Sequence, residues 1–205
     1  MIAPDDQHTI RTFIAIPIPQ HLGDFLEKIQ AEIKANRVNA SWTKRSSMHL
    51  TLRFFGETTE DKIKMIIQAM QETTAAIHPF SISAKGIGVF PKIKNARVIW
   101  AGVSGQTGQL LAVNRSLSQT LSQKGIRSDS NHFSPHFTLG RLRKRPDRNQ
   151  LKTIIQDFEN HESAPCLIQS MVLFKSDLKP SGAVHTPIFK AVFSGSYDHQ
   201  TAFTV

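Results

Sequence analysis

The chain has 205 residues and a net charge of +9 at pH 7 with histidine neutral, because 25 Lys and Arg residues outnumber 16 Asp and Glu residues. Its hydrophobic fraction of 40% and charged fraction of 20% are those of a folded globular protein and exclude a disordered or fibrous one. The single cysteine, Cys166, excludes an internal disulfide and is typical of a reducing compartment. The positive charge favours phosphates, nucleic acids or acidic surfaces as partners.

The residue patterns predict an uneven alternation of strands and helices. Short runs rich in β-branched and aromatic residues predict strands at residues 12–16, 48–55, 80–90, 97–103, 135–142, 167–175 and 187–194. Apolar residues at helical spacing predict helices at residues 22–33, 59–76, 110–121 and 148–160. No segment approaches the about 20 apolar residues of a membrane helix, and no signal peptide is evident at the first residues. We therefore expect a cytoplasmic protein without membrane contact.

One stretch of the sequence occurs twice. Ser-Met-His-Leu-Thr-Leu-Arg at residues 47–53 reappears as Ser-Pro-His-Phe-Thr-Leu-Gly at residues 134–140, so that Ser, His, Thr and Leu recur at the same offsets 87 residues later. Each copy lies in a predicted strand. A long period that occurs only twice indicates two similar lobes facing one another and not a solenoid. No linker divides the chain, and we expect one domain over residues 1–205.

The two copies place histidine and threonine together. Successive side chains of a strand point to opposite faces, so His49 shares a face with Thr51, and His136 shares a face with Thr138. In-line attack on a phosphodiester needs a base for the incoming oxygen and an acid for the departing oxygen. Two histidines on opposite sides can supply both at neutral pH. Threonine hydroxyls can donate hydrogen bonds to the non-bridging phosphate oxygens.

This chemistry requires no metal and no cofactor. The other histidines show no His-x-x-x-His or Cys partner at the spacing of metal ligands, so we expect no zinc site. A single His-x-Thr in a strand is more often a partly buried histidine than a catalytic one. Packing, however, gives no reason to repeat both His and Thr on the face opposite the leucines.

The paired motif and its surroundings resemble the two-histidine (2H) phosphoesterases, and within them the RNA 2',3'-cyclic phosphodiesterases, also described as 2'-5' RNA ligase-like. The segments that carry the resemblance are residues 11–16, 42, 49–56, 86–91, 97–100 and 135–141. The resemblance implies an α+β fold with two pseudo-symmetric lobes, antiparallel sheets that form a central cleft, and helices outside. It also implies metal-independent opening of a 2',3'-cyclic phosphate to a 2'-phosphate, and in some members joining of RNA ends through 2'-5' linkages.

The resemblance also suggests the role of each site residue. His49 would be the general acid that protonates the departing 3' oxygen, and His136 the general base that activates water, although the near-symmetry of the motif leaves this assignment open. Thr51 and Thr138 would hold the phosphate. The expected substrates are RNA with 2',3'-cyclic phosphate ends or small cyclic nucleotides, and nothing in the sequence indicates an obligate protein partner.

Two arginines are candidates for a further phosphate ligand. Arg141 fits the family pattern, but strand parity puts it on the face opposite His136 unless a bulge near Gly140 turns it round. Arg53 has the correct parity without a bulge, but it can equally be an exposed strand cation. At His185, relatives often have Tyr, which leaves the contacts with the end of the substrate open.

Several other residues near the motifs are open to two interpretations. His132 is a candidate to support the second motif. The basic cluster Arg141, Arg143, Lys144, Arg145 and Arg148 either contacts an RNA backbone or is a solvated loop. Phe13, Phe54 and Phe90 are candidates to stack on a base. The function itself has an alternative, a non-catalytic module that binds RNA termini in the same cleft.

Overall fold

A computed structural model of the protein describes residues 8–127, 133–144, 147–180 and 182–195. The strands are β1 (Ile10–Pro17), β2 (Ala40–Trp42), β3 (His49–Thr58), β4 (Phe80–Phe90), β5 (Val98–Gly105), β6 (Phe137–Leu142), β7 (Cys166–Ile168), β8 (Ser170–Lys179) and β9 (Gly182–Val192). The α-helices are α1 (Gln20–Ala35), α2 (Glu60–Ala75), α3 (Thr107–Gln123) and α4 (Arg148–Asp157), and the short 3-10 helices are η1 (Arg45–Ser47) and η2 (Ile93–Asn95). The expected α+β class is confirmed.

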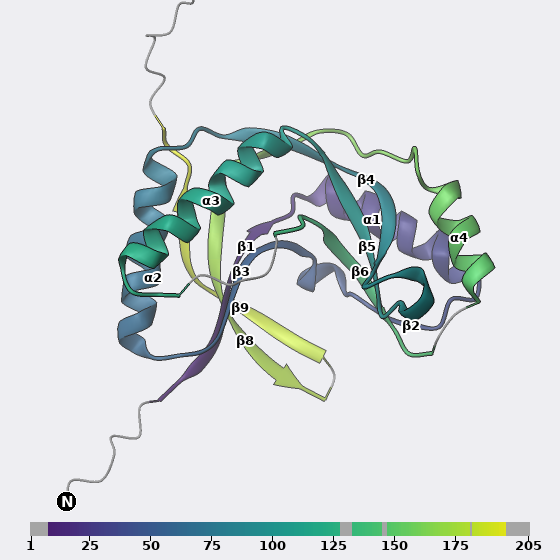
Figure 1. Cartoon of the computed structure of the whole chain (residues 1–205), viewed down its shortest axis with the longest axis horizontal. Helices are drawn as coiled ribbons and strands as arrows, with labels where there is room; N and C mark the ends of the chain where they lie inside the picture. Colours follow the sequence, from purple (N-terminus) through teal and green to yellow (C-terminus); the bar gives the residue numbers. More distant parts are fainter. Residues whose placement is uncertain (1–7, 128–132, 145–146, 181, 196–205) are drawn as a thin grey trace, which may run out of the picture.

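The strands form one antiparallel sheet in the order β7-β4-β5-β6-β3-β1-β8-β9, with β2 paired to β6. We call β2, β4, β5, β6 and β7 the second half, because it carries His136, and β1, β3, β8 and β9 the first half. The halves meet where β3 pairs with β6 through Leu50 and Phe137. Helices α2 and α3 cover the first half, and α1 and α4 lie against the second (Figure 1). The two expected lobes therefore share a continuous sheet.

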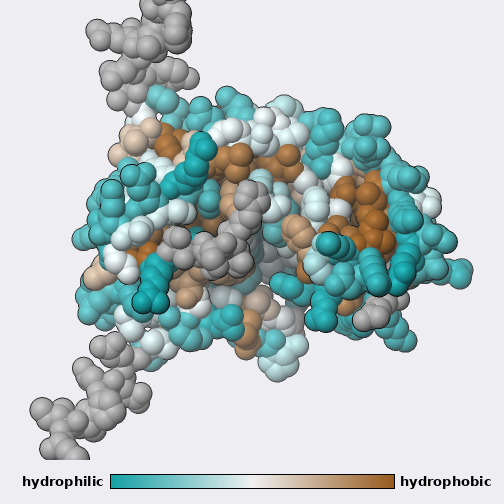
Figure 2. Space-filling model, in the orientation of Figure 1, coloured by the Kyte–Doolittle hydropathy of each residue, from teal (hydrophilic) through white to brown (hydrophobic). Residues whose placement is uncertain are grey.

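Amphipathic helices build the core between helices and sheet. The buried apolar side chains of α1 are Leu22, Leu26, Ile29 and Ile33, and those of α3 are Leu110, Val113, Leu117 and Leu121. Both sets recur at intervals of three and four residues, which gives each helix one apolar face. These residues belong to one cluster that also includes Leu50 and Phe137 at the junction of the halves. Hydrophilic residues cover much of the outer surface (Figure 2).

The C-terminal hairpin is longer than the sequence predicts. The predicted strands end at residue 175 and resume at residue 187, whereas β8 and β9 stay paired as far as Lys179 and Gly182. The extra length projects from the sheet, and its Leu178 is 66% exposed. Residues in this projecting ribbon lack the alternation of a half-buried strand, so the hydrophobic pattern does not reveal it. The pairing sets His185 opposite Ser176.

Candidate active site

The two His-x-Thr motifs line one cleft of about 910 Å³ at the junction of the two halves. His49, Thr51, His136, Thr138 and Arg141 all contribute to its wall. The β3 and β6 strands are antiparallel and pair at Leu50 and Phe137, the residues that directly follow the two histidines. This register directs His49 toward Thr138 and His136 toward Thr51. The junction therefore brings together the groups that the repeat predicts.

A bulge in β6 brings Arg141 to the cleft. Thr138 pairs with Trp100 but Gly140 pairs with Ile99, so β6 has one extra residue at this point. The extra residue reverses the side-chain alternation, and Arg141 pairs with Val98 on the face of Thr138. Gly140 itself packs against Trp42, since a Cβ there would lie 3.0 Å from the indole ring. The register thus confirms the bulge near Gly140 that turns Arg141 toward the cleft.

The first copy has the same bulge, which sequence reasoning missed. Thr51 pairs with Ala15 but Arg53 pairs with Ile14, so the alternation of β3 reverses at Leu52. Arg53 consequently lies on the opposite face from Thr51, where its guanidinium donates to the backbone oxygen of Arg127. The expectation that Arg53 reaches the site by parity alone is wrong. Phe54 takes the place that Arg141 has in the second copy and lines the cleft with 62% of its surface exposed.

Burial controls the charge of His49. Desolvation lowers the pKa of the imidazole from 6.5 to about 4, and the nearby His185 lowers it further than His136 does. A hydrogen bond with the backbone of Ser47 partly opposes this by raising the pKa. In the free protein His49 is therefore neutral at pH 7.

The second histidine has a defined tautomer. Nδ1 of His136 lies 2.7 Å from the backbone oxygen of Ser134. Because a carbonyl oxygen can only accept, Nδ1 carries the proton and Nε2 of the neutral ring is the free acceptor. Ser47 and Ser134 precede the two histidines by the same two residues, and each contributes its backbone to the neighbouring ring.

Aromatic rings surround His49. The ring of Phe13 is centred 4.8 Å from His49, 4.8 Å from His185 and 5.3 Å from Phe174. His185 meets His49 edge-on with ring centres 5.3 Å apart. Nδ1 of His185 is buried without a hydrogen-bond partner among the described residues, and burial lowers the pKa of this side chain. His185 thus contacts His49 of the first motif. This contact becomes visible only when β9 is placed beside β8 in the sheet.

The three phenylalanines singled out in the sequence, Phe13, Phe54 and Phe90, all line the cleft. Trp42, which is one of the positions that carry the resemblance, also lines it, and so does Lys44, which sequence reasoning missed. Cys166 is buried in β7, and desolvation raises the pKa of its thiol. His132 and Arg145 lie outside the described residues.

None of the described helices is long and apolar enough to span a membrane. Within the same residues, no three His, Cys, Asp or Glu side chains gather in a way that could hold a metal ion.

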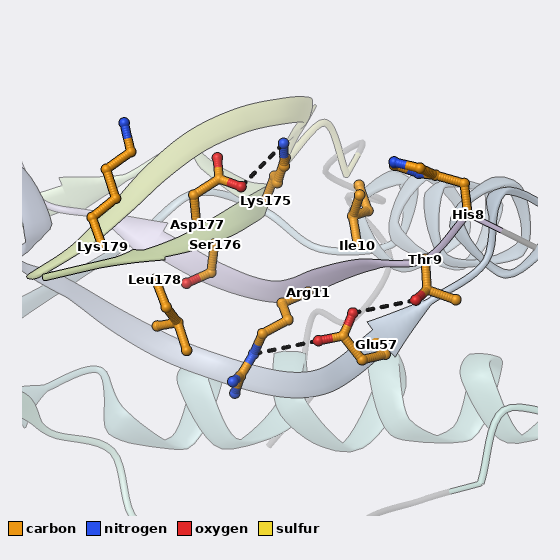
Figure 3. A pocket seen from close by; sticks show the side chains of 10 residues that line it. All are labelled: His8, Thr9, Ile10, Arg11, Glu57, Lys175, Ser176, Asp177, Leu178 and Lys179. Carbon is orange, nitrogen blue, oxygen red and sulfur yellow. Dashed lines mark hydrogen bonds and ion pairs between the residues drawn. The ribbon is translucent and has the colours of Figure 1, made fainter.

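Beside the cleft lies a second pocket of about 550 Å³, between the N-terminal part of β1 and the outer part of β8 (Figure 3). Arg11, Ser176 and Leu178 line both cavities. In the second pocket, Arg11 is 4.0 Å from Glu57 and Lys175 is 3.1 Å from Asp177. Two of its cations thus lie beside carboxylates, unlike Arg141 in the main cleft.

Two imidazoles, two hydroxyls and an arginine around one open cleft form a site suited to a phosphate ester. The family model of LigT-like phosphoesterases matches the chain twice, over residues 16–100 and 102–185, so each match contains one His-x-Thr motif. The chain belongs to this phosphoesterase family, and the resemblance seen in the sequence is confirmed.

Relatives agree with this assignment, and solved structures share the fold. The chain is 31% identical over 186 residues to the RNA 2',3'-cyclic phosphodiesterase of Thermotoga maritima, covering 91% of this chain and 97% of the relative. It is 30% identical over 177 residues to the enzyme of the same name from Methanothermobacter thermautotrophicus, covering 86% and 95%. The fold is similar to TT0787 of Thermus thermophilus, with a TM-score of 0.74 and 23% identity over 92% of this chain and all of that one. It is also similar to LigT of E. coli complexed with 3'-AMP, with a TM-score of 0.71 and 18% identity over 91% and 99%.

Proposed function

We propose that this phosphoesterase opens the 2',3'-cyclic phosphate of an RNA end, or of a small cyclic nucleotide, to a 2'-phosphate. The observation that carries the proposal is the meeting of both His-x-Thr motifs in one cleft. The names of the relatives, which are about 30% identical over most of the chain, support the same substrate. Since each half supplies one histidine, the two lobes act as one catalytic domain.

The two histidines divide the proton transfers. His136 takes a proton from water through Nε2, which its hydrogen bond from Nδ1 to Ser134 leaves free. The water oxygen bonds to phosphorus as the bond to the 3' oxygen breaks, and His49 donates a proton to that oxygen. Arg141 and the hydroxyls of Thr51 and Thr138 hold the non-bridging oxygens. The reaction consumes one water and requires no metal.

The low pKa of His49 is compatible with an acid role only if the substrate raises it. A phosphate charge about 4 Å from an imidazolium contributes about 4 kcal/mol at an effective dielectric constant of about 20. That energy raises a pKa by roughly 3, from about 4 to near neutrality. Arg141 shares the phosphate charge, so this value is an upper one. Binding of the substrate thus protonates His49, which then acts as the general acid.

The experiment is hydrolysis of a 2',3'-cyclic nucleotide in EDTA by the wild type, His49→Ala and His136→Ala, with circular dichroism to establish that each variant folds. We expect wild-type turnover to a 2'-phosphate and a loss of at least about 100-fold in each variant. An EDTA-sensitive activity would overturn the two-histidine mechanism, and a 3'-phosphate product would reassign the leaving oxygen.

Two further measurements define the range of the activity. If the wild type binds RNA ends but hydrolyses no cyclic phosphate, the protein is a binding module, and the enzymatic proposal is wrong. Incubation of the enzyme with RNA ends that carry 2',3'-cyclic phosphate and 5'-hydroxyl groups tests for ligation. A product whose new linkage is 2'-5' would add the ligase activity that some family members are expected to have.

A further inference from the structure

Seven exposed cations come from three neighbouring segments at one end of the second half, and we call this set the basic edge. Its members are Lys44, Lys92, Lys94, Arg97, Arg141, Arg143 and Lys144. Lys44 and Arg141 line the catalytic cleft, whereas the other five lie beyond it. The basic edge therefore starts inside the proposed active site and continues outward over the surface.

Backbone hydrogen bonds hold the three segments of the basic edge together. Arg141 of β6 pairs with Ser41 of β2 on one side and with Val98 of β5 on the other. The amide of Leu142 donates to the oxygen of Arg97 at 2.9 Å, and the amide of Arg143 donates to the oxygen of Asn39 at 3.0 Å. Figure 1 shows the teal turn of η2 at the same end of the molecule as β2 and the end of β6. Cations that are far apart in the sequence thus share one rigid edge.

The basic edge has no acidic counterpart of its own. Residues 36–48, 90–98 and 137–144, which build it, contain no Asp or Glu. None of its seven cations forms an ion pair with a described residue. On α2, by contrast, Lys64 pairs with both Glu60 and Asp61. Cations held close together without counter-ions repel one another, and a polyanion would relieve that repulsion.

The second pocket is a weaker candidate for a polyanion, although it also adjoins the cleft. Figure 3 shows that Lys175 points to Asp177 and Arg11 to Glu57, so carboxylates already balance two of its cations. A phosphate entering there would meet both signs of charge. The basic edge offers only positive charge, and it starts at Arg141, the residue that the bulge of β6 directs to the scissile phosphate.

We propose that the basic edge binds the phosphates of the RNA strand that precedes the terminal cyclic phosphate. The proposal rests on the proposed function, because it takes the cleft as the site of the 3' end. A cyclic 2',3'-phosphate ends its strand, so the remaining nucleotides leave the cleft in one direction only. That direction is across β6 toward Arg143 and η2. The protein consequently favours an oligoribonucleotide over a mononucleotide.

The test compares two triple variants on two substrates. Lys92→Gln, Lys94→Gln and Arg143→Gln together remove three charges of the basic edge that do not line the cleft. The control removes three exposed charges elsewhere, by Lys62→Gln, Arg115→Gln and Lys190→Gln. The substrates are a short oligoribonucleotide with a 2',3'-cyclic phosphate end and a 2',3'-cyclic mononucleotide, and kcat/KM is measured over a series of salt concentrations.

We expect the basic-edge variant to lose roughly 10-fold to 100-fold in kcat/KM for the oligoribonucleotide at about 0.1 M salt, and its logarithmic salt dependence to weaken by about 2. Turnover of the mononucleotide should stay within about 2-fold, since all three positions lie outside the cleft. The control variant should change neither. An equal loss on both substrates, no loss on the oligoribonucleotide, or the same loss in the control would overturn the proposal.

A failure of the proposed hydrolytic function can be distinguished from a failure of the proposed strand path. If the wild type hydrolyses neither substrate, the hydrolytic activity is refuted while the basic edge is still testable. Binding of a fluorescent oligoribonucleotide with a 3'-phosphate, followed by anisotropy, then replaces turnover. Binding that weakens only in the basic-edge variant would support the strand path, and binding that is equal in both triple variants would refute it.

Discussion

The depressed pKa of His49 makes the stability of the protein depend on pH. In the unfolded chain this imidazole titrates near 6.5, whereas in the folded protein burial lowers its pKa to about 4. Between these values the unfolded state binds the proton and the folded state does not, so protonation favours unfolding. The stabilisation is complete above about pH 6.5 and is lost as the pH falls toward 4. We therefore predict an acid sensitivity that His49→Asn removes.

The magnitude follows from the two pKa values. A difference of about 2.5 corresponds to a limit of about 3.5 kcal/mol, since one pKa unit equals about 1.4 kcal/mol. At pH 4.5, where the folded ring is already partly protonated, the loss relative to pH 8 is about 2.5 kcal/mol. The other titratable groups are present in both proteins, and among the described histidines only His185 and His136 are coupled to His49.

The measurement is urea unfolding of both proteins at pH 8 and pH 4.5. The wild type should lose about 2.5 kcal/mol more than His49→Asn over this interval, with equal m-values. The absolute stability of the variant does not matter, because only the change with pH is compared. If the two proteins lose the same free energy of unfolding within about 0.5 kcal/mol, burial among the aromatic rings does not lower the pKa of His49.

Three other substitutions test the surroundings of the motifs. Replacing His185 by Asn should raise the pKa of His49, but not as far as 6.5 because burial remains the larger cause; an unchanged pKa in a ¹⁵N NMR titration would contradict this. Gly140→Ala puts a Cβ 3.0 Å from the Trp42 ring, and thermal unfolding should show a loss of about 1 to 3 kcal/mol, whereas an unchanged Tm would show that the ring moves freely. Phe54→Ala should raise KM for a cyclic nucleotide by about 10-fold and leave stability nearly unchanged, and a similar rise with a baseless ribose cyclic phosphate would exclude stacking.

The core positions and the motif faces could be predicted from the sequence because they depend on local periodicity. The helical spacing of Leu22, Leu26, Ile29 and Ile33 identifies the buried face of α1 directly. The alternation in His-x-Thr identifies one face of a strand over three residues, a distance too short for register errors to accumulate. The repeat then predicts that two such faces meet, which the single sheet achieves at Leu50 and Phe137.

Contacts that depend on pairing between distant strands could not be predicted in this way. His185 meets His49 only because β8 lies beside β1 and carries β9 with it. Parity also fails beyond a bulge, and a bulge leaves little trace in one sequence. Gly140 marks the bulge of β6, but Leu52 in β3 is an ordinary strand residue. The position of Arg53 on the face opposite the cleft therefore cannot be predicted before the register is known.

The two bulges explain how nearly identical motifs become chemically different. Without a bulge, the residue four positions after each histidine would face the cleft. With the bulge, the residue five positions after it does so instead, which is Phe54 in the first copy and Arg141 in the second. Phe54 packs against Phe13, the ring that contacts His49, and Arg141 lines the cleft where the basic edge begins. In the proposed mechanism, such a difference around two equal titratable groups would separate the acid from the base. The residue five positions after each histidine is therefore one source of asymmetry between the copies, and the rings of Phe13 and His185 that contact His49 are another.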